Sequence, residues 1–177
     1  VAVVVLVVGV LGIRSLRSAL HGDDAALVRD PTTAVDRLPW HTEHYGDLAI
    51  RVPTAPDASA VDAASGFGRF DRYELPDVTL TITSRGAVAG LDTDAALRSY
   101  ASQMTQLEGG AVTSGVARDL TFGTAFSATL QTPEGTGYLY VVSTPTVVVV
   151  IRADAPSIAS GRPTRIFEQV IRSVTPG

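Results

Sequence analysis

The side chains best suited to chemistry lie close together between residues 41 and 47. His41, His44 and Asp47 would offer two imidazoles and a carboxylate to a metal ion if a loop brought them together. Their spacing matches neither of the zinc-protease patterns HExxH and HxxEH. Histidines at the edge of a linker are more often solvated than ligating, so we expect a surface cluster here. Metal binding by these residues, or a cell-envelope hydrolase that uses His41 and His44, is the alternative.

The serines and the other carboxylates form no recognisable catalytic pattern. There is no Gly-x-Ser-x-Gly elbow that would present a serine nucleophile. Asp92 and Asp94 could act as paired carboxylates in acid–base chemistry, but Asp92 is expected to cap a helix. Nothing in the sequence places Asp119 or Glu134 near them. We therefore expect a protein that is not an enzyme.

The composition removes several enzyme classes. The chain has no cysteine, which excludes disulfides, thiolate zinc sites and cysteine nucleophiles. All 14 basic residues are arginine, so the lysine of a pyridoxal-phosphate Schiff base or a Walker A loop is missing. No cofactor is expected. Arginine without lysine, with abundant Ala, Val and Gly, is typical of GC-rich coding and indicates an actinobacterial source.

Arginine stands beside aromatic residues in the stretch Arg69-Phe70-Asp71-Arg72-Tyr73. Such a stretch could hold an anionic ligand or the carboxylate of a partner protein. Solvated or salt-bridged arginines are the simpler interpretation. Because Trp, Tyr and Arg dominate binding hot spots, the residues that we expect at an interface are Trp40, Tyr45, Arg69, Arg72 and Tyr73.

The length of the chain indicates its domain organisation, and its net charge limits the classes of partner that it can bind. The 177 residues, of which 45% are hydrophobic, suit one domain with a substantial core and an additional tail. The net charge is −4 and there is no basic stripe. Nucleic acid is therefore not expected as a partner.

An apolar segment occupies residues 1–13, VAVVVLVVGVLGI. A helix of this length spans about 20 Å, whereas the hydrocarbon core of a bilayer is about 30 Å thick. The segment is interpreted as the end of a transmembrane anchor; a signal-peptide region and a buried element are the alternatives. The next residues, Arg14-Ser15-Leu16-Arg17, form no small-residue cleavage site, which favours an uncleaved anchor.

Three parts are expected along the chain. They are a membrane anchor helix over residues 1–20, interpreted as truncated because it lacks an initiator Met, a linker over 21–39 and a globular domain over 40–177. This order is common in cell-surface proteins. We therefore expect a single-pass protein of the cell membrane with its domain outside the cytoplasm.

Two periodicities alternate in the domain. Period-two patterns predict strands at residues 48–52, 70–75, 78–83, 112–120, 126–130, 138–143 and 146–151. The last of these is apolar on both faces, so we place it centrally in a sheet. Apolar residues at helical spacing predict one helix that is capped by Asp92 and stops at Gly109-Gly110, and another that begins at Pro163.

Short turns between successive strands favour an antiparallel sheet. The two amphipathic helices can cover it. We therefore predict an α+β fold, an α/β sandwich with one main antiparallel sheet and two helices, preceded by the N-terminal apolar helix.

The order of these elements resembles the PsbP/Mog1-like fold, and within it the mycobacterial lipoprotein LpqN group. The matching stretches are residues 45–53, 93–108, 123–151 and 166–174. Members of this fold family are mostly non-enzymatic proteins that contact other proteins, so the resemblance implies a binding role. The lipid-bearing cysteine of the lipoproteins is missing here, which leaves anchoring to residues 1–13.

The expected function is that of a membrane-tethered, non-catalytic binding or scaffolding module. It would act through protein contacts, with another envelope protein as the partner, or through a small apolar ligand. The alternatives are the hydrolase based on His41 and His44 and an accessory domain of a longer membrane protein.

Overall fold

The computed structural model describes Val35 and residues 37–53, 58–59, 68–75, 77–107, 110–133, 135–155 and 162–177. The chain divides into two units, Val1–Arg37 and Leu38–Gly177. The predicted anchor and most of the predicted linker lie outside the described residues and stay predictions. Among the helices that are described, none is both long enough and apolar enough to span a membrane.

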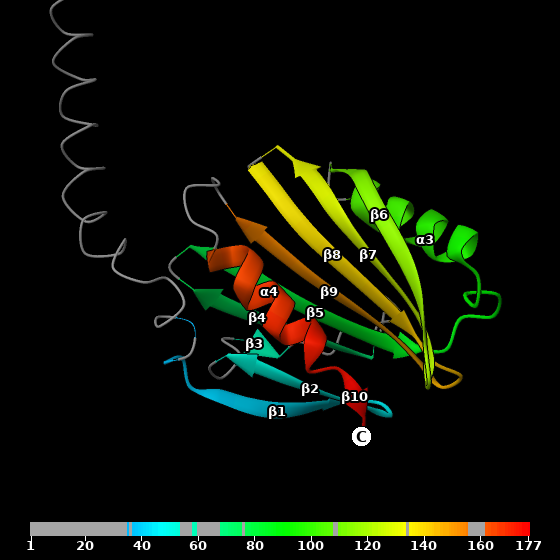
Figure 1. The fold of residues 1–177 in the computed structure, drawn as a ribbon, viewed down its shortest axis with the longest axis horizontal. Coiled ribbons are helices and arrows are strands. Elements are labelled where there is room, and N and C mark those ends of the chain that lie inside the picture. Colours follow the sequence, from blue (N-terminus) through cyan, green and yellow to red (C-terminus); the bar gives the residue numbers. More distant parts are fainter. Residues whose placement is uncertain are drawn as a thin grey trace, which may run out of the picture. The chain divides into compact units, whose positions relative to one another are not determined.

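The described elements belong to the second unit (Figure 1). The first half comprises β1 (Trp40–Tyr45), β2 (Leu48–Pro53), β3 (Ala58–Ser59), β4 (Arg69–Leu75), β5 (Val78–Gly86) and α3 (Asp94–Leu107). The second half comprises β6 (Ala111–Leu120), β7 (Gly123–Thr132), β8 (Gly135–Ser143), β9 (Val147–Ala155), α4 (Arg162–Arg172) and β10 (Thr175–Pro176).

The main sheet has the strand order β3-β4-β5-β9-β8-β7-β6. Every pair of neighbours is antiparallel. β9 lies in the middle of this sheet, and its apolar run Val147–Ile151 is buried throughout. These observations confirm the predicted α+β fold and the central position of this strand.

Helix α3 covers one face of the sheet. It brings Leu97, Tyr100 and Ala101 into a buried apolar cluster with side chains from β7, β8 and β9. The helix is capped by Thr93, whose hydroxyl accepts a hydrogen bond from the Ala96 N–H at 3.3 Å. The prediction that Asp92 is the cap was wrong by one residue, because the helix begins at Asp94 and the cap has to reach the amides of its first turn.

Helix α4 covers the opposite face. Successive residues of a strand point to opposite faces, so Tyr138 of β8 points away from Leu139 and from α3. Its ring stacks on Phe167 of α4, with 5.5 Å between the ring centroids. Its hydroxyl lies 2.8 Å from the Thr164 hydroxyl. The predicted apolar stripe of α4 therefore packs on the sheet, and the sheet stands between the two helices.

A second, smaller sheet with the order β1-β2-β10 lies on the α4 side. β1 was not predicted as a strand, because its inward positions carry His41, Glu43 and Tyr45, of which only Tyr45 is hydrophobic. The turn between β1 and β2 requires Gly46, which has a positive φ of 64°. A Cβ atom there would also lie 2.9 Å from Cβ of Val147.

Candidate binding groove

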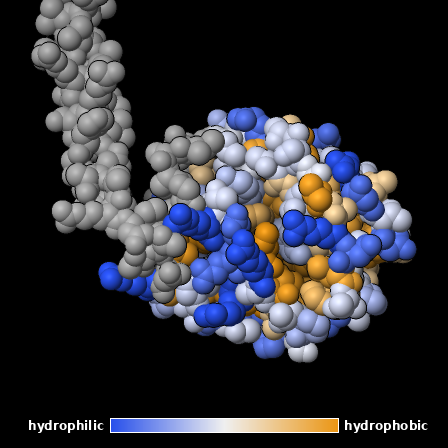
Figure 2. Space-filling model, viewed as in Figure 1, coloured by the Kyte–Doolittle hydropathy of each residue, from blue (hydrophilic) through white to orange (hydrophobic). Residues whose placement is uncertain are grey.

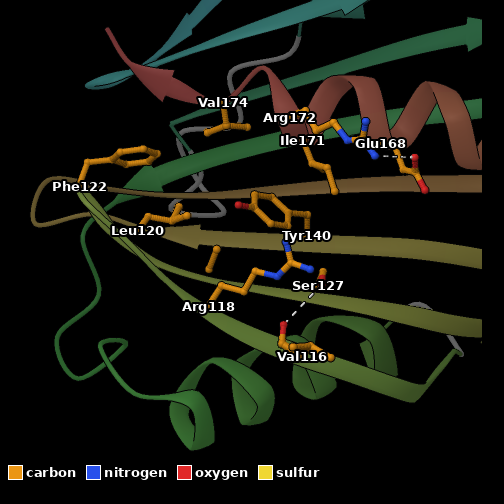
Figure 3. Close-up of a pocket in the computed structure, with 11 residues that line it drawn as sticks. Val116, Arg118, Leu120, Phe122, Ser127, Tyr140, Glu168, Ile171, Arg172 and Val174 are labelled. Atoms are coloured by element: carbon orange, nitrogen blue, oxygen red, sulfur yellow. Dashed lines mark hydrogen bonds and ion pairs between the residues drawn. The ribbon is translucent and has the colours of Figure 1, made fainter.

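A groove opens on the α4 side of the main sheet (Figure 3). Within the described part, α4 packs on β8 and β9 and leaves the same face of β6 and β7 without a covering helix. The space that remains has a volume of about 400 Å³. Its lining comes from the sheet, from α4 and from the residues that follow α4: Val116, Arg118, Leu120, Phe122, Ala125, Ser127, Tyr140, Glu168, Ile171, Arg172 and Val174.

The alternation of strand residues explains the lining. Val116, Arg118 and Leu120 are alternate residues of β6, so all three side chains point to the groove. β7 adds Ala125 and Ser127 by the same rule. The result is a floor on which apolar side chains lie beside Arg118 and Ser127. Figure 2 shows apolar surface on this side of the molecule between hydrophilic side chains.

A guanidinium group stands on each wall of the groove. Arg172 on α4 forms an ion pair with Glu168 at 3.2 Å, and both side chains are exposed, so this pair stabilises little. Arg118 on β6 faces Tyr140 in the middle of the groove (Figure 3). Burial raises the pKa of the Tyr140 phenol, and the Arg118 charge opposes that rise. The groove therefore combines apolar and aromatic surface with positive charge.

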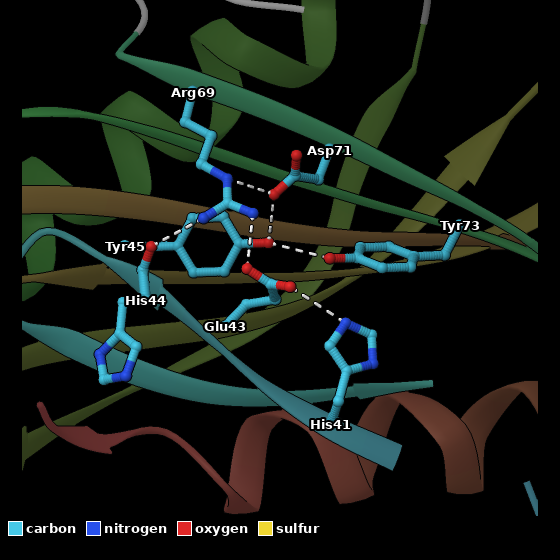
Figure 4. A network of polar contacts seen from close by, with 7 residues as sticks. All are labelled: His41, Glu43, His44, Tyr45, Arg69, Asp71 and Tyr73. Atoms are coloured by element: carbon cyan, nitrogen blue, oxygen red, sulfur yellow. Dashed lines mark hydrogen bonds and ion pairs between the residues drawn. The ribbon is translucent and has the colours of Figure 1, made fainter. Parts of the chain in front are cut away.

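The predicted metal ligands do not converge. His41 and Glu43 point from β1 towards β4, whereas His44 points from the other face of the same strand (Figure 4). Asp47 lies in the β1–β2 turn and accepts a hydrogen bond from the Thr144 hydroxyl at 3.0 Å. In the described part of the chain, no three His, Cys, Asp or Glu residues are grouped as metal ligands would be.

The inward side chains of β1 instead join a polar network with β4 (Figure 4). His41 Nε2 lies 3.1 Å from Glu43 Oε1, and Arg69 donates a hydrogen bond of 2.7 Å to Glu43 Oε2. The Arg69 guanidinium also lies 2.6 Å from Asp71 Oδ2 and 4.6 Å from the centre of the Tyr45 ring.

At the inner end of the network lies a buried carboxylate. Asp71 is fully buried, and its Oδ2 accepts a hydrogen bond of 2.7 Å from the Tyr45 hydroxyl. The Tyr45 hydroxyl also lies 3.1 Å from the Tyr73 hydroxyl. Burial raises the pKa of Tyr45 far above its ordinary value and that of Tyr73 to about 12. Both phenols are therefore neutral hydrogen-bonding groups of the interior.

This burial changes the expected interface. Tyr45 and Tyr73 are 1% and 0% exposed, so their side chains are not accessible to a partner. Arg72 is exposed and pairs with Glu74, while Trp40 and Arg69 are half-buried. The five residues do not form one surface. No residue of the groove was predicted as part of a site, because the alternation in β6 indicates an open face only once the strand order is known.

The contribution of this network to stability depends on pH through the carboxyl group of Glu43. The hydrogen bond from Arg69 is the largest influence on its carboxyl group and, with the nearby charges, holds the pKa below the ordinary value of 4.5 despite partial burial. A lowered pKa stabilises the fold above the unfolded-state pKa, and that stabilisation is lost as the pH falls through the folded-state pKa. We expect Glu43→Gln to lower the free energy of unfolding by about 1 kcal/mol at neutral pH.

The difference between Glu43→Gln and the unaltered protein should shrink as the pH falls below 4.5. Urea denaturation of both proteins across the acid range measures it. Glu168→Gln, which removes an exposed carboxylate that is also paired with an arginine, is the matched control and should have a smaller effect at neutral pH. A Glu43→Gln difference that does not change with pH would contradict the prediction.

Comparison with known proteins shows the fold. No protein-family profile and no curated protein sequence matches the chain. Among solved structures, the chain is similar to the solution structure of cyanobacterial PsbP (CyanoP) from Synechocystis sp. PCC 6803. The TM-score is 0.60 at 11% sequence identity, and the match covers 79% of this chain and 92% of that chain. The chain therefore has a PsbP-like fold, as predicted. The finer resemblance to the LpqN group stays a prediction.

Proposed function

We propose that this domain is a non-catalytic binding module that holds a partner protein in the groove between α4 and β6–β8. The observation that carries the proposal is the combination, in one groove, of apolar and aromatic side chains with a guanidinium group on each wall. Apolar and aromatic surface supplies most of the binding free energy at interfaces, and charged groups on the rim orient the partner. The PsbP-like fold is compatible with this role and does not identify the partner.

The proposal includes the tether. Residues 1–13 would hold the chain in the cell membrane, the domain would lie outside the cytoplasm, and the partner would be another envelope protein. Support for this part comes from the apolar sequence of that segment alone. The hydrolase alternative gains no support, since His41 and His44 lie on opposite faces of one strand.

Site-specific photo-crosslinking in the native host tests the proposal. A photoreactive amino acid replaces Val116, which is 59% exposed on the groove, or Gln103, which is exposed on α3. We expect a specific protein adduct from position 116 and none of the same mass from position 103. Adding Ser127→Phe, which fills the groove from β7, should remove the adduct.

Thr129→Phe is the matched control for the filled groove. Thr129 lies on the same strand and face as Ser127, two residues further along, and is not part of the groove lining. With this substitution the adduct should persist. Identical adducts from positions 116 and 103, or an adduct that survives Ser127→Phe, would show that the groove is not the binding site.

A further inference from the structure

β6 is an edge strand beside the groove. In the described part of the chain it pairs with β7 on one side only. It is 10 residues long and carries neither proline nor lysine, the residues that commonly protect such edges. Its pairing is irregular only between Val112 and Ser114, so the stretch from Ser114 to Leu120 is a regular template for another strand.

The edge and the groove are continuous. Val116, Arg118 and Leu120 line the groove from the strand that forms the edge. A strand added to β6 would place every second side chain on the groove side, next to these three residues. Main-chain hydrogen bonds would supply affinity, and the groove would select the side chains.

The charge of the groove defines those side chains. Arg118 forms no ion pair among the described residues, although the apolar surface around it makes a carboxylate partner favourable. Val116, which is 59% exposed, and Leu120 would be buried most favourably against apolar side chains of the added strand. An added segment that suits the groove therefore carries, at alternate positions on its groove-side face, an acidic residue opposite Arg118 with an apolar residue on either side of it.

We propose that the partner binds as an extended segment that adds a strand to β6, with a carboxylate side chain paired to Arg118 and apolar side chains beside Val116 and Leu120. This inference rests on the proposed function, because it states how the groove recognises its partner. A second copy of this chain fits less well. The acidic residue of β6, Asp119, points to the opposite face from Arg118, so a β6–β6 pair leaves Arg118 without a carboxylate.

A synthetic peptide of about eight residues provides the probe: its groove-side face carries valine, glutamate and valine at alternate positions, and the residues between them are threonine. It is added to the full chain in mild detergent, and amide hydrogen exchange is followed by mass spectrometry. We expect slower exchange over residues 111–120 when the peptide is bound, because the free amides of the edge become hydrogen-bonded. Exchange in β3, which lies at the other end of the strand order of the main sheet, should not change.

Two altered peptides separate strand addition from other modes of binding. A peptide with N-methylated amides on both edges cannot donate hydrogen bonds to β6 and should not slow the exchange. The same peptide with lysine in place of the groove-side glutamate should bind about tenfold more weakly than the glutamate peptide, as should the glutamate peptide to Arg118→Ala. Arg165→Ala, an exposed arginine of α4 outside the groove lining, should leave binding unchanged.

The remaining outcomes distinguish strand addition to β6 from the more general proposal that the groove binds a partner. Equal binding of the normal and N-methylated peptides, or no protection of β6 by the glutamate peptide, overturns strand addition. If the adduct from position 116 still forms in that case, the groove function stands without it. Protection of β6 before any peptide is added, together with a dimeric mass in solution, would assign the edge to a second copy of this chain and would also overturn the inference.

Discussion

Replacing Asp71 by alanine is expected to lower the free energy of unfolding by about 3 kcal/mol. The carboxylate is fully buried and accepts from both the Tyr45 hydroxyl and the Arg69 guanidinium. Its removal leaves the buried Tyr45 hydroxyl with fewer partners and takes one of two paired carboxylates from the half-buried Arg69 guanidinium. Urea denaturation at neutral pH measures the loss.

The same strand offers a matched control for this prediction. Arg72 and Glu74 have the same spacing as Arg69 and Asp71 but point to the opposite face of β4, where the pair is exposed. Glu74→Ala should therefore change the unfolding free energy by less than about 1 kcal/mol. Asp71→Asn, which keeps an acceptor for Tyr45 and removes the charge, should lie between the two. Similar losses for Asp71→Ala and Glu74→Ala would mean that burial does not determine the contribution of these pairs.

The second large effect is expected at Phe126, the fully buried aromatic of the cluster under α3. Its ring packs against the bare backbone of Gly115, where a Cβ atom would lie 2.2 Å from the ring. Phe126→Ala removes this packing and leaves a cavity, which typically costs about 3–5 kcal/mol. Thermal or urea unfolding of the purified domain measures the loss.

Phe122 is the natural comparison, because it precedes the same strand but is half-buried and lines the groove. Phe122→Ala should lower stability by less than about 1.5 kcal/mol and should weaken the photo-crosslink from position 116. Under conditions where the Phe126→Ala protein remains folded, we expect it to lose more stability than the Phe122→Ala protein and to keep more of the photo-crosslink from position 116. A Phe122→Ala protein that is as unstable as Phe126→Ala would place Phe122 in the core and would weaken the case for an open groove.

Local patterns were sufficient where one face of an element is apolar. The clean alternation of Val78, Leu80 and Ile82 identified β5, and the apolar run of β9 identified the central strand. β1 was not predicted because its inward face is polar: His41 and Glu43 lie over Arg69 rather than over an apolar core. A hydrophobicity pattern cannot detect a strand whose buried side is held by ion pairs and hydrogen bonds.

The candidate sites show the same limit. Aromatic and arginine residues of β1 and β4 were expected together at an interface, but Arg69 and Asp71 are paired with residues 26 positions away. Whether such side chains face a partner or the interior depends on how β1 lies over β4. Tyr45 and Tyr73 were therefore placed on a surface although they are buried.

The amino-acid sequence by itself determined that the chain forms an α+β domain with an antiparallel sheet and two amphipathic helices, because periodicity and turn residues act locally. Only the tertiary structure decided that α3 and α4 cover opposite faces, that β9 stands between β5 and β8, and that β6 forms an edge. These arrangements depend on contacts between segments far apart in the chain. The groove exists because α4 covers only part of one face, which no local pattern records.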